Sequence, residues 1–245
     1  MHRSMPRRRW LAAMLAVLGF TFLVNRGSAQ NAHLEQRLDK PVTLDKGIDR
    51  KTPLKDALEF LSDRYDIAIR IDSAAFKERL KLDDVGNAPV HLPRISGVRL
   101  GLVLTLLAKQ VNGSYDIKRD YIEIMPFQKG VTPKKSSETW QKASKRVAEL
   151  LDKPIDVEGI GLKTPLKDAL EFLADRYDVA IVLDYSAFKQ GKKEVMIEDV
   201  PVTQPVQKRV KLGEVLKMLL KQVGASYEII DGAIIVAPPK KKDSV

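Results

Sequence analysis

The sequence predicts an α+β fold made of two tandem copies of a small sandwich domain. The first observation is a duplication, since residues 51–72 and 163–184 are identical at 18 of 22 positions. The second is that helical and strand periodicities follow one another in the same order in both copies. The copies lie 112 residues apart, much more than the roughly 20–50 residues of a solenoid repeat, so each unit is large enough to own a core.

Each copy opens with a predicted strand that begins at a proline, and a helix follows it. In copy one, Thr52 is suited to the helix N-cap and Pro53 to the first helical position, where a missing N–H costs nothing. Apolar side chains then recur on one helix face. The strands span residues 38–48 and 151–160, and the apolar positions are Leu54, Ala57, Leu58 and Leu61 in copy one and Leu166, Ala169, Leu170 and Leu173 in copy two.

The remainder of each copy predicts a second strand, a third strand in a variable acidic segment, a second helix and a hairpin. The stretches "DIAIRID" and "DVAIVLD" alternate as strands do. In copy two, Asp231 and Gly232 form a two-residue turn signal, and copy one has Arg119 and Asp120 there. The predicted order is strand, helix, strand, strand, helix, hairpin.

A linker rich in proline, glycine, lysine and serine separates the copies. After it, Trp140, Ala143, Val147 and Leu150 recur at helical spacing, which predicts a lead-in helix anchored on copy two by Trp140. The predicted organisation is a signal peptide (1–29), copy one (30–126), a linker (127–137), the lead-in helix with copy two (138–239) and a basic tail (240–245).

The N-terminus has the features of an export signal. Arginines precede an uncharged apolar run over residues 10–24, and the small residues up to Ala29 predict cleavage before Gln30. The run is shorter than the roughly 20 residues of a spanning helix, which favours cleavage over a retained anchor. We expect ordinary Sec export rather than the twin-arginine route, and a periplasmic or envelope-associated protein with no transmembrane helix after signal removal.

Charge and cysteine content exclude several classes of protein. The signal carries five arginines and no acid, so its removal lowers the formal charge from +10 to +5. Such a mixed surface is not typical of a nucleic-acid-binding protein. The absence of cysteine excludes disulfides, thiolate catalysis and thiolate metal sites.

The pattern "TPL-x-x-AL-x-x-L", an "IxID" strand, "L-x-x-VL-x-x-LL", "SY-x-I" and a final "I-x-V" strand resembles the secretin and TonB N-terminus short domain. The resemblance covers both copies. It implies a small periplasmic α+β sandwich that works by contacting other proteins. The chain departs from the family's known settings because neither a secretin pore segment nor a receptor barrel follows the copies.

The residues that could carry chemistry do not form a duplicated site. None of His2, His33 and His91 has a histidine at the equivalent position of the other copy. The acidic "DRYD" motifs, at Asp63 to Asp66 and Asp175 to Asp178, are interpreted as solvated helix faces with ordinary surface pairing. We therefore expect no catalytic residue, no cofactor and no metal site, and we interpret Gly101 and Gly213 as close-packing positions.

One difference between the copies suggests a binding surface. Three polar strand positions of copy one, Arg70, Lys118 and Glu123, become Val182, Ile230 and Ile235 in copy two. By strand alternation these apolar side chains lie on the second side of the sheet and need a cover. One hypothesis is a surface for an envelope protein partner or for self-association. The alternative is that the lead-in helix or copy one supplies the cover.

The sequence thus favours an exported, non-catalytic protein that acts through protein–protein contact as an interaction module or scaffold. An envelope-polymer module that binds peptidoglycan or polysaccharide is the first alternative. An enzyme with a carboxylate site is the second.

Overall fold

The computed structural model describes residues 32–128, 137–188 and 196–240. The predicted signal peptide, its cleavage site at Ala29 and Gln30, most of the linker and the end of the basic tail lie outside these residues. Helices and strands are mixed along the chain, so the α+β prediction is confirmed. Within the described ranges, every helix is too short or too polar to cross a bilayer.

The same series of elements occurs in both copies. Copy one has a helical segment over residues 32–38, then β1 (Pro41–Leu44), β2 (Ile48–Pro53), α2 (Leu54–Tyr65), β3 (Ile69–Ile71), α3 (Ser73–Leu80), η1 (Val85–Asn87), β4 (Pro89–Leu92), β5 (Ile95–Arg99), α4 (Leu100–Gln110), β6 (Gly113–Ile117) and β7 (Ile122–Pro126). Copy two has α5 (Glu138–Leu151), β8 (Pro154–Val157), β9 (Ile160–Pro165), α6 (Leu166–Tyr177), β10 (Ala180–Leu183), α7 (Tyr185–Phe188), η2 (Ile197–Asp199), β11 (Pro201–Gln204), β12 (Gln207–Lys211), α8 (Leu212–Gln222), β13 (Ser226–Ile230) and β14 (Ala233–Ala237).

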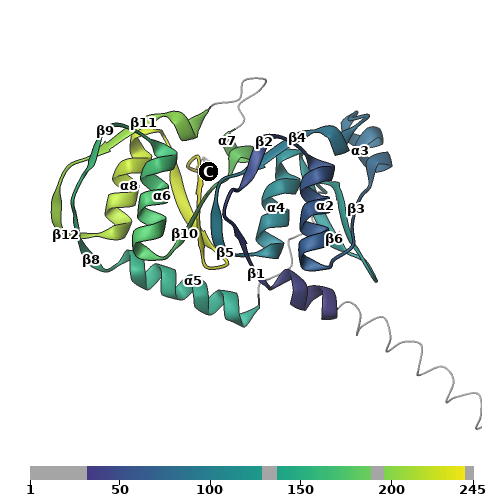
Figure 1. Ribbon diagram of the computed structural model, residues 1–245, viewed down its shortest axis with the longest axis horizontal. Coiled ribbons are helices and arrows are strands. Elements are labelled where there is room, and N and C mark those ends of the chain that lie inside the picture. Colours follow the sequence, from purple (N-terminus) through teal and green to yellow (C-terminus); the bar gives the residue numbers. More distant parts are fainter. Residues whose placement is uncertain (1–31, 129–136, 189–195, 241–245) are drawn as a thin grey trace, which may run out of the picture.

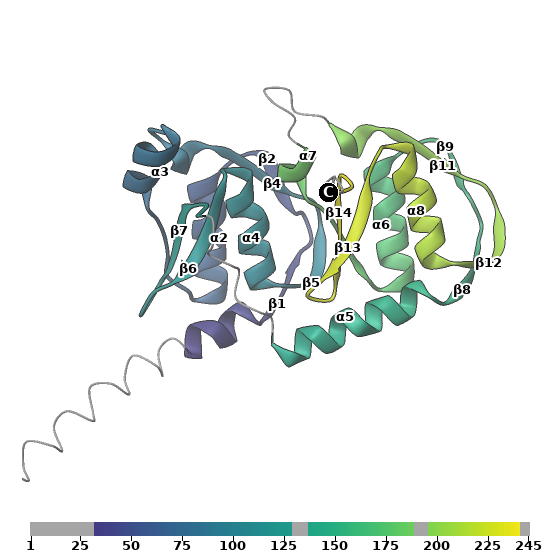
Figure 2. The same cartoon turned by 180° about the vertical axis from the view of Figure 1, so that it is seen from behind.

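Each copy places its two long helices between a three-stranded sheet and two short ladders. The sheets have the orders β3-β7-β6 and β10-β14-β13, in which the first pair is parallel and the second is the antiparallel hairpin. Figure 1 and, from behind, Figure 2 show the copies side by side, with the sheet of copy two next to the β1-β5 ladder of copy one. The copies are therefore stacked head to tail.

The start of the first helix differs from the prediction. Thr52 lies in β2 and the N-cap is Pro53, which has an extended conformation (φ −58°, ψ 144°) and makes no side-chain cap bond. A neighbouring strand connection supplies the cap instead, because the Leu54 N–H donates to the Ala88 carbonyl at 2.9 Å. Copy two repeats this arrangement, with the Leu166 N–H donating to Val200 at 2.9 Å.

The variable segment contains more structure than the single predicted strand. In copy one it forms α3, η1, β4 and β5, and the side chains of Asp72 and Asp84 cap its two short helices. The second long helix fixes this segment through a glutamine. Gln110 bonds both the N–H and the carbonyl of His91, at 3.0 and 2.7 Å, and Gln222 does the same for Thr203 in copy two.

The hairpin prediction for copy two is confirmed. Asp231 and Gly232 both have left-handed φ values, 50° and 75°, as a type I′ turn requires, and Ile230 pairs with Ala233. The packing interpretation of the helix-start glycines is also confirmed. A Cβ on Gly101 would lie 2.9 Å from the hydroxyl oxygen of Tyr115. Any larger residue at position 101 would therefore displace this ring.

The copies do not each close a separate core. Val182, Ala233 and Ile235 of copy two belong to the hydrophobic cluster of copy one, and most other buried apolar residues of copy two form a second cluster. The lead-in helix α5 packs on α8, β13 and β14, as predicted. Its Trp140 also reaches copy one, where the indole N–H donates to the Asp39 carbonyl at 2.9 Å.

Candidate functional site: the cleft between the two copies

The predicted association surface is covered by the chain itself. Val182 and Ile235 are 0% and 1% exposed, and both pack in the core of copy one. Ile230 is half-buried against the same core. The hypothesis of a free surface at these residues is therefore wrong, because copy one provides the cover that the sequence required.

Copy one has a matching apolar face on helix α4. Leu102, Leu106 and Lys109 share one face of this helix, and Lys109 bonds Asp184 of copy two at 3.1 Å. Leu102 and Leu106 are buried. Their equivalents in α8 are Glu214 and Met218, and Glu214 is exposed. Each copy is thus apolar on the face that meets the other copy.

Polar contacts surround this shared core. The Arg99 guanidinium lies 2.7 Å from the Asp231 carboxylate and 3.1 Å from Asp39, with Arg99 and Asp231 both 8% exposed. A buried ion pair of this kind orients two surfaces strongly, because either charge is costly to bury alone. Together with the Trp140 bond, it fixes how the copies lie against each other.

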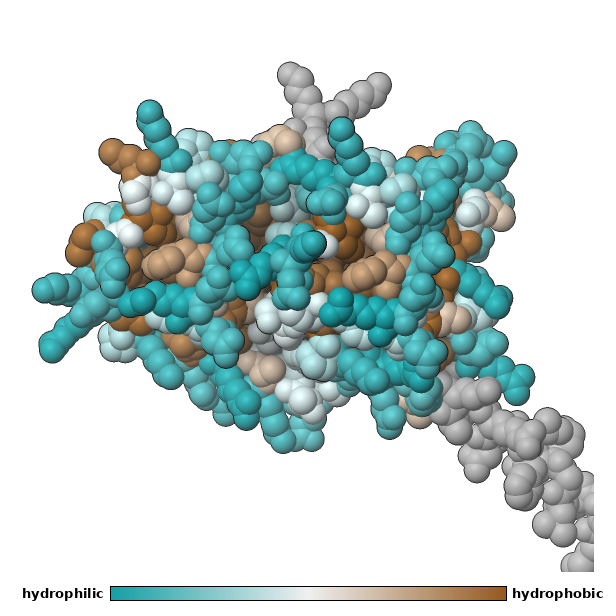
Figure 3. Space-filling model, viewed as in Figure 1, coloured by the Kyte–Doolittle hydropathy of each residue, from teal (hydrophilic) through white to brown (hydrophobic). Residues whose placement is uncertain are grey.

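Beside this interface a cleft of about 540 Å³ remains open between the copies. Its apolar surface comes from both copies and includes Ile48 and Ile95 on one side and Leu170, Ile181 and Leu183 on the other. Figure 3 shows apolar surface, in brown, along the middle of the molecule between hydrophilic side chains. The cleft exists only because the two copies are docked.

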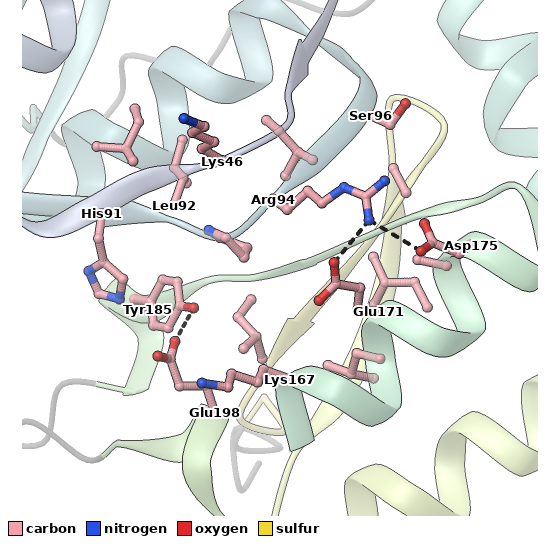
Figure 4. Close-up of a pocket in the computed structure, with 18 of the residues that line it drawn as sticks. Lys46, His91, Leu92, Arg94, Ser96, Lys167, Glu171, Asp175, Tyr185 and Glu198 are labelled. Carbon is pink, nitrogen blue, oxygen red and sulfur yellow. Dashed lines mark hydrogen bonds and ion pairs between the residues drawn. The ribbon is translucent and has the colours of Figure 1, made fainter. Parts of the chain in front are cut away.

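An arginine crosses one part of the cleft. Arg94, in the connection between β4 and β5, bonds Glu171 at 3.0 Å and Asp175 at 3.2 Å on helix α6 (Figure 4). The two acids lie one helical turn apart on the same face, so one guanidinium reaches both. Their carboxylates, led by Glu171, raise the pKa of Arg94.

A second polar cluster lies at another part of the wall. Tyr185 donates its hydroxyl hydrogen bond to Glu198, and Arg50 of copy one donates to the same carboxylate. The His91 ring packs against the Tyr185 ring, with centroids 3.7 Å apart (Figure 4). Copy one thus contributes Arg50 and His91, and copy two contributes Tyr185 and Glu198.

The environment of this cluster shifts two pKa values in opposite directions. Burial, and then the hydrogen bond to Glu198, raise the pKa of Tyr185 well above its ordinary range. Burial alone would raise the pKa of Glu198, but the hydrogen bonds from Tyr185 and Arg50 outweigh it and hold this pKa below its ordinary value. Near neutral pH the phenol is therefore protonated and the carboxylate is charged.

The acidic motifs singled out from the sequence have different surroundings in the two copies. In copy one, Asp66 pairs with Arg37 at 2.7 Å, away from the cleft. In copy two, Asp175 and Asp178 line the cleft. Surface pairing was the interpretation of these motifs, and for Asp175 the partner is an arginine of the other copy. Among the described residues, no group of three or more histidine, cysteine, aspartate or glutamate side chains could hold a metal ion.

Sequence reasoning did not identify the residues that join the copies across the cleft. Arg50 and Arg94 stand where copy two has Leu162 and Val206, and Glu198 stands where copy one has Gly86. The comparison that revealed Val182, Ile230 and Ile235 contained this signal. At Arg50, Arg94 and Glu198, the copy that carries the charge makes a contact that the other copy does not make.

Comparison of the chain with protein family models, with curated proteins and with solved structures found no match. The function must therefore be argued from the site itself.

Proposed function

We propose that the chain is an exported, non-catalytic protein that binds another protein of the cell envelope, with the cleft between its two copies as the contact site. Export rests on the N-terminal sequence. The resemblance to the secretin and TonB N-terminus short domain supports the same compartment and the same mode of action.

The observation that carries the proposal is a cleft of about 540 Å³ that needs both copies to exist. Clefts with apolar walls and a few convergent polar groups are the usual location of binding sites. The copies are held by contacts specific to each of them, including the pair of Arg99 with Asp231. The duplication therefore creates a cleft that a single copy could not form.

The ionisable groups that join the two walls of the cleft support binding rather than catalysis. Arg94 is engaged by Glu171 and Asp175, and Glu198 by Tyr185 and Arg50. A general acid or base works best when its pKa is near the working pH. The pKa shifts of Tyr185 and Glu198 lead away from neutrality, so neither group is suited to exchange a proton there.

The lining of the cleft also favours a protein partner over an envelope polymer. We expected a polymer-binding module to display exposed aromatic side chains along a polar groove. The aromatic rings among the lining residues are those of His91 and Tyr185, which are 6% and 8% exposed. Both rings are occupied with each other, so neither offers an open platform for a sugar.

Photo-crosslinking in intact cells tests this function with the full-length chain. A photoreactive residue is placed at Ser96, which lines the cleft, and in a control at Lys208, the equivalent position of copy two. We expect a crosslink to one envelope protein from position 96 that position 208 does not give. Equal crosslinking from both positions, or crosslinks to glycan alone, would refute the proposal.

A further inference from the structure

One edge of strand β10 lies in the cleft, where β5 of copy one contacts this strand. Strand β10 lies at the outside of the sheet β10-β14-β13, and within the described residues no strand pairs with its other edge. Ala180, Ile181 and Leu183 of this strand line the cleft. Edge strands carry rows of backbone donors and acceptors that readily accept a further strand.

The hydrogen-bond pattern shows which residues direct their backbone groups to this edge. The Asp184 N–H donates to the Val236 carbonyl at 2.9 Å, so residue 184 directs its N–H toward β14. Successive residues of a strand direct their N–H and C=O groups to alternate sides. Val182 therefore bonds toward β14, and Ile181 and Leu183 direct their backbone groups to the opposite edge, where Ile181 is half-buried and Leu183 is 3% exposed.

Both walls of the cleft carry charges of both signs, since Asp49 of copy one and Lys167 of copy two also line it. Lys46 belongs to copy one and Asp178 to copy two, and both line the cleft. Among the described residues, neither takes part in an ion pair. The apolar surface of Ile95 and Leu170 lies among the same lining residues. A ligand that satisfies this wall needs an apolar side chain and charged side chains of both signs.

We propose that the cleft binds an extended peptide segment of a partner protein, which adds as a strand to the edge of β10 at Ile181. The segment carries an apolar residue that packs on Ile95 and Leu170, an acidic residue that pairs with Lys46 and a basic residue that pairs with Asp178. Main-chain bonds give such a complex its affinity, and the side-chain positions give it specificity. This inference rests on the proposed function and specifies the chemistry of the partner.

The probe is a synthetic library of acetylated, amidated pentapeptides, each with one lysine, one glutamate and a central valine, isoleucine or leucine. Binding to residues 30–245 is measured by fluorescence anisotropy, and amide hydrogen exchange is followed by NMR. We expect the best peptide to slow exchange at Ile181. We also expect backbone N-methylation of that peptide to weaken its binding at least tenfold, although its side chains are unchanged.

Two proline variants test the strand edge with a matched control. Ile181→Pro removes one N–H from the cleft edge but leaves the bonds of Val182 and Asp184 to β14 in place, a position where edge strands tolerate proline. Ile69→Pro makes the same change at the equivalent position of β3 in copy one, whose edge is outside the cleft. We expect Ile181→Pro to lose at least tenfold in peptide affinity and Ile69→Pro to bind normally, with both variants folded.

Three results would overturn the inference. They are binding that N-methylation does not weaken, equal effects of the two proline variants, and no binding by any library member. The proposed function is tested separately, because it depends on the crosslink from position 96. A specific crosslink without peptide binding would overturn strand addition and retain the protein contact, and loss of that crosslink would overturn the function itself.

Discussion

Replacement of Ile235 by alanine tests the conclusion that copy one covers the sheet of copy two. Ile235 is 1% exposed, pairs in register with Val182 and packs in the core of copy one. Removal of a buried aliphatic side chain costs about 2–5 kcal/mol, and the cost is greater where neighbours cannot collapse into the space. Here the space is bounded by two copies that ion pairs hold in place, so we expect a loss of about 3 kcal/mol.

Urea unfolding provides the measurement, followed by far-UV circular dichroism and by tryptophan fluorescence. Trp140 is the single tryptophan after residue 29, and its indole bonds copy one, so its fluorescence reports on the contact between the copies. With a slope of about 2 kcal/mol per molar urea, the midpoint should fall by about 1.5 M. Both probes should shift together, because the core is shared.

Glu123→Ala is the matched control, since Glu123 occupies the equivalent position on the sheet of copy one. Its side chain is 20% exposed and pairs with Lys118, which is 33% exposed. Such partly exposed pairs contribute about 0–1 kcal/mol. If Ile235→Ala cost no more than this control, the sheet of copy two would not be covered by copy one, and the stacking described above would be refuted.

Three further predictions use the same unfolding assay. Gly232→Ala should cost about 1–2 kcal/mol, because the turn residue has a left-handed φ of 75°; an unchanged midpoint would contradict this. Arg99→Ala should cost about 3 kcal/mol, because it leaves the Asp231 carboxylate buried without its arginine; a loss near zero would show that the pair does not orient the copies. For Glu198 the folded pKa is below the unfolded value, so its contribution is complete above about pH 4.3 and is lost as the pH falls through the folded pKa. Stability of Glu198→Gln should therefore depend less on pH in this acidic range, and an unchanged pH profile would contradict the assigned shift.

Much of the fold follows from patterns that are visible in the sequence. The apolar stripes of α2, α4, α6 and α8 repeat at helical spacing, and the turn at Asp231 and Gly232 requires a hairpin. The short elements of the variable segment could not be obtained in this way. Helix α3 has eight residues and η1 has three, too few for periodicity, and each is set by one aspartate cap.

The start of α2 shows another limit of local reasoning. Thr52 followed by Pro53 has the composition of a helix start, yet the cap comes from the carbonyl of Ala88. That partner lies 34 residues beyond Leu54, at a point where no sequence pattern places it. The sequence predicted the start of α2 to within one residue. It did not predict the carbonyl group that accepts the hydrogen bond from the first N–H of the helix.

The site was only partly predictable for a related reason. The comparison of copies correctly required a cover for Val182 and Ile235, because a strand's second face cannot remain apolar in water. It did not identify the cover or the cleft, since both depend on how two complete surfaces meet. The change from Leu102 in α4 to Glu214 in α8 was the available signal for the second surface.

The outer ends of the stacked pair are polar where the junction of the two copies is apolar. The free sheet face of copy one carries Arg70 and Glu123 where copy two has apolar residues, and Lys118 pairs with Glu123 at 3.2 Å. The free face of α8 carries Glu214, paired with Lys217 at 2.8 Å. Head-to-tail contact between molecules would bury these charges, which costs free energy unless each charge is paired in the contact. Terminal repeats of other repeat proteins also have polar outer faces, so the contrast between these ends and the apolar junction is the pattern that stacked copies require.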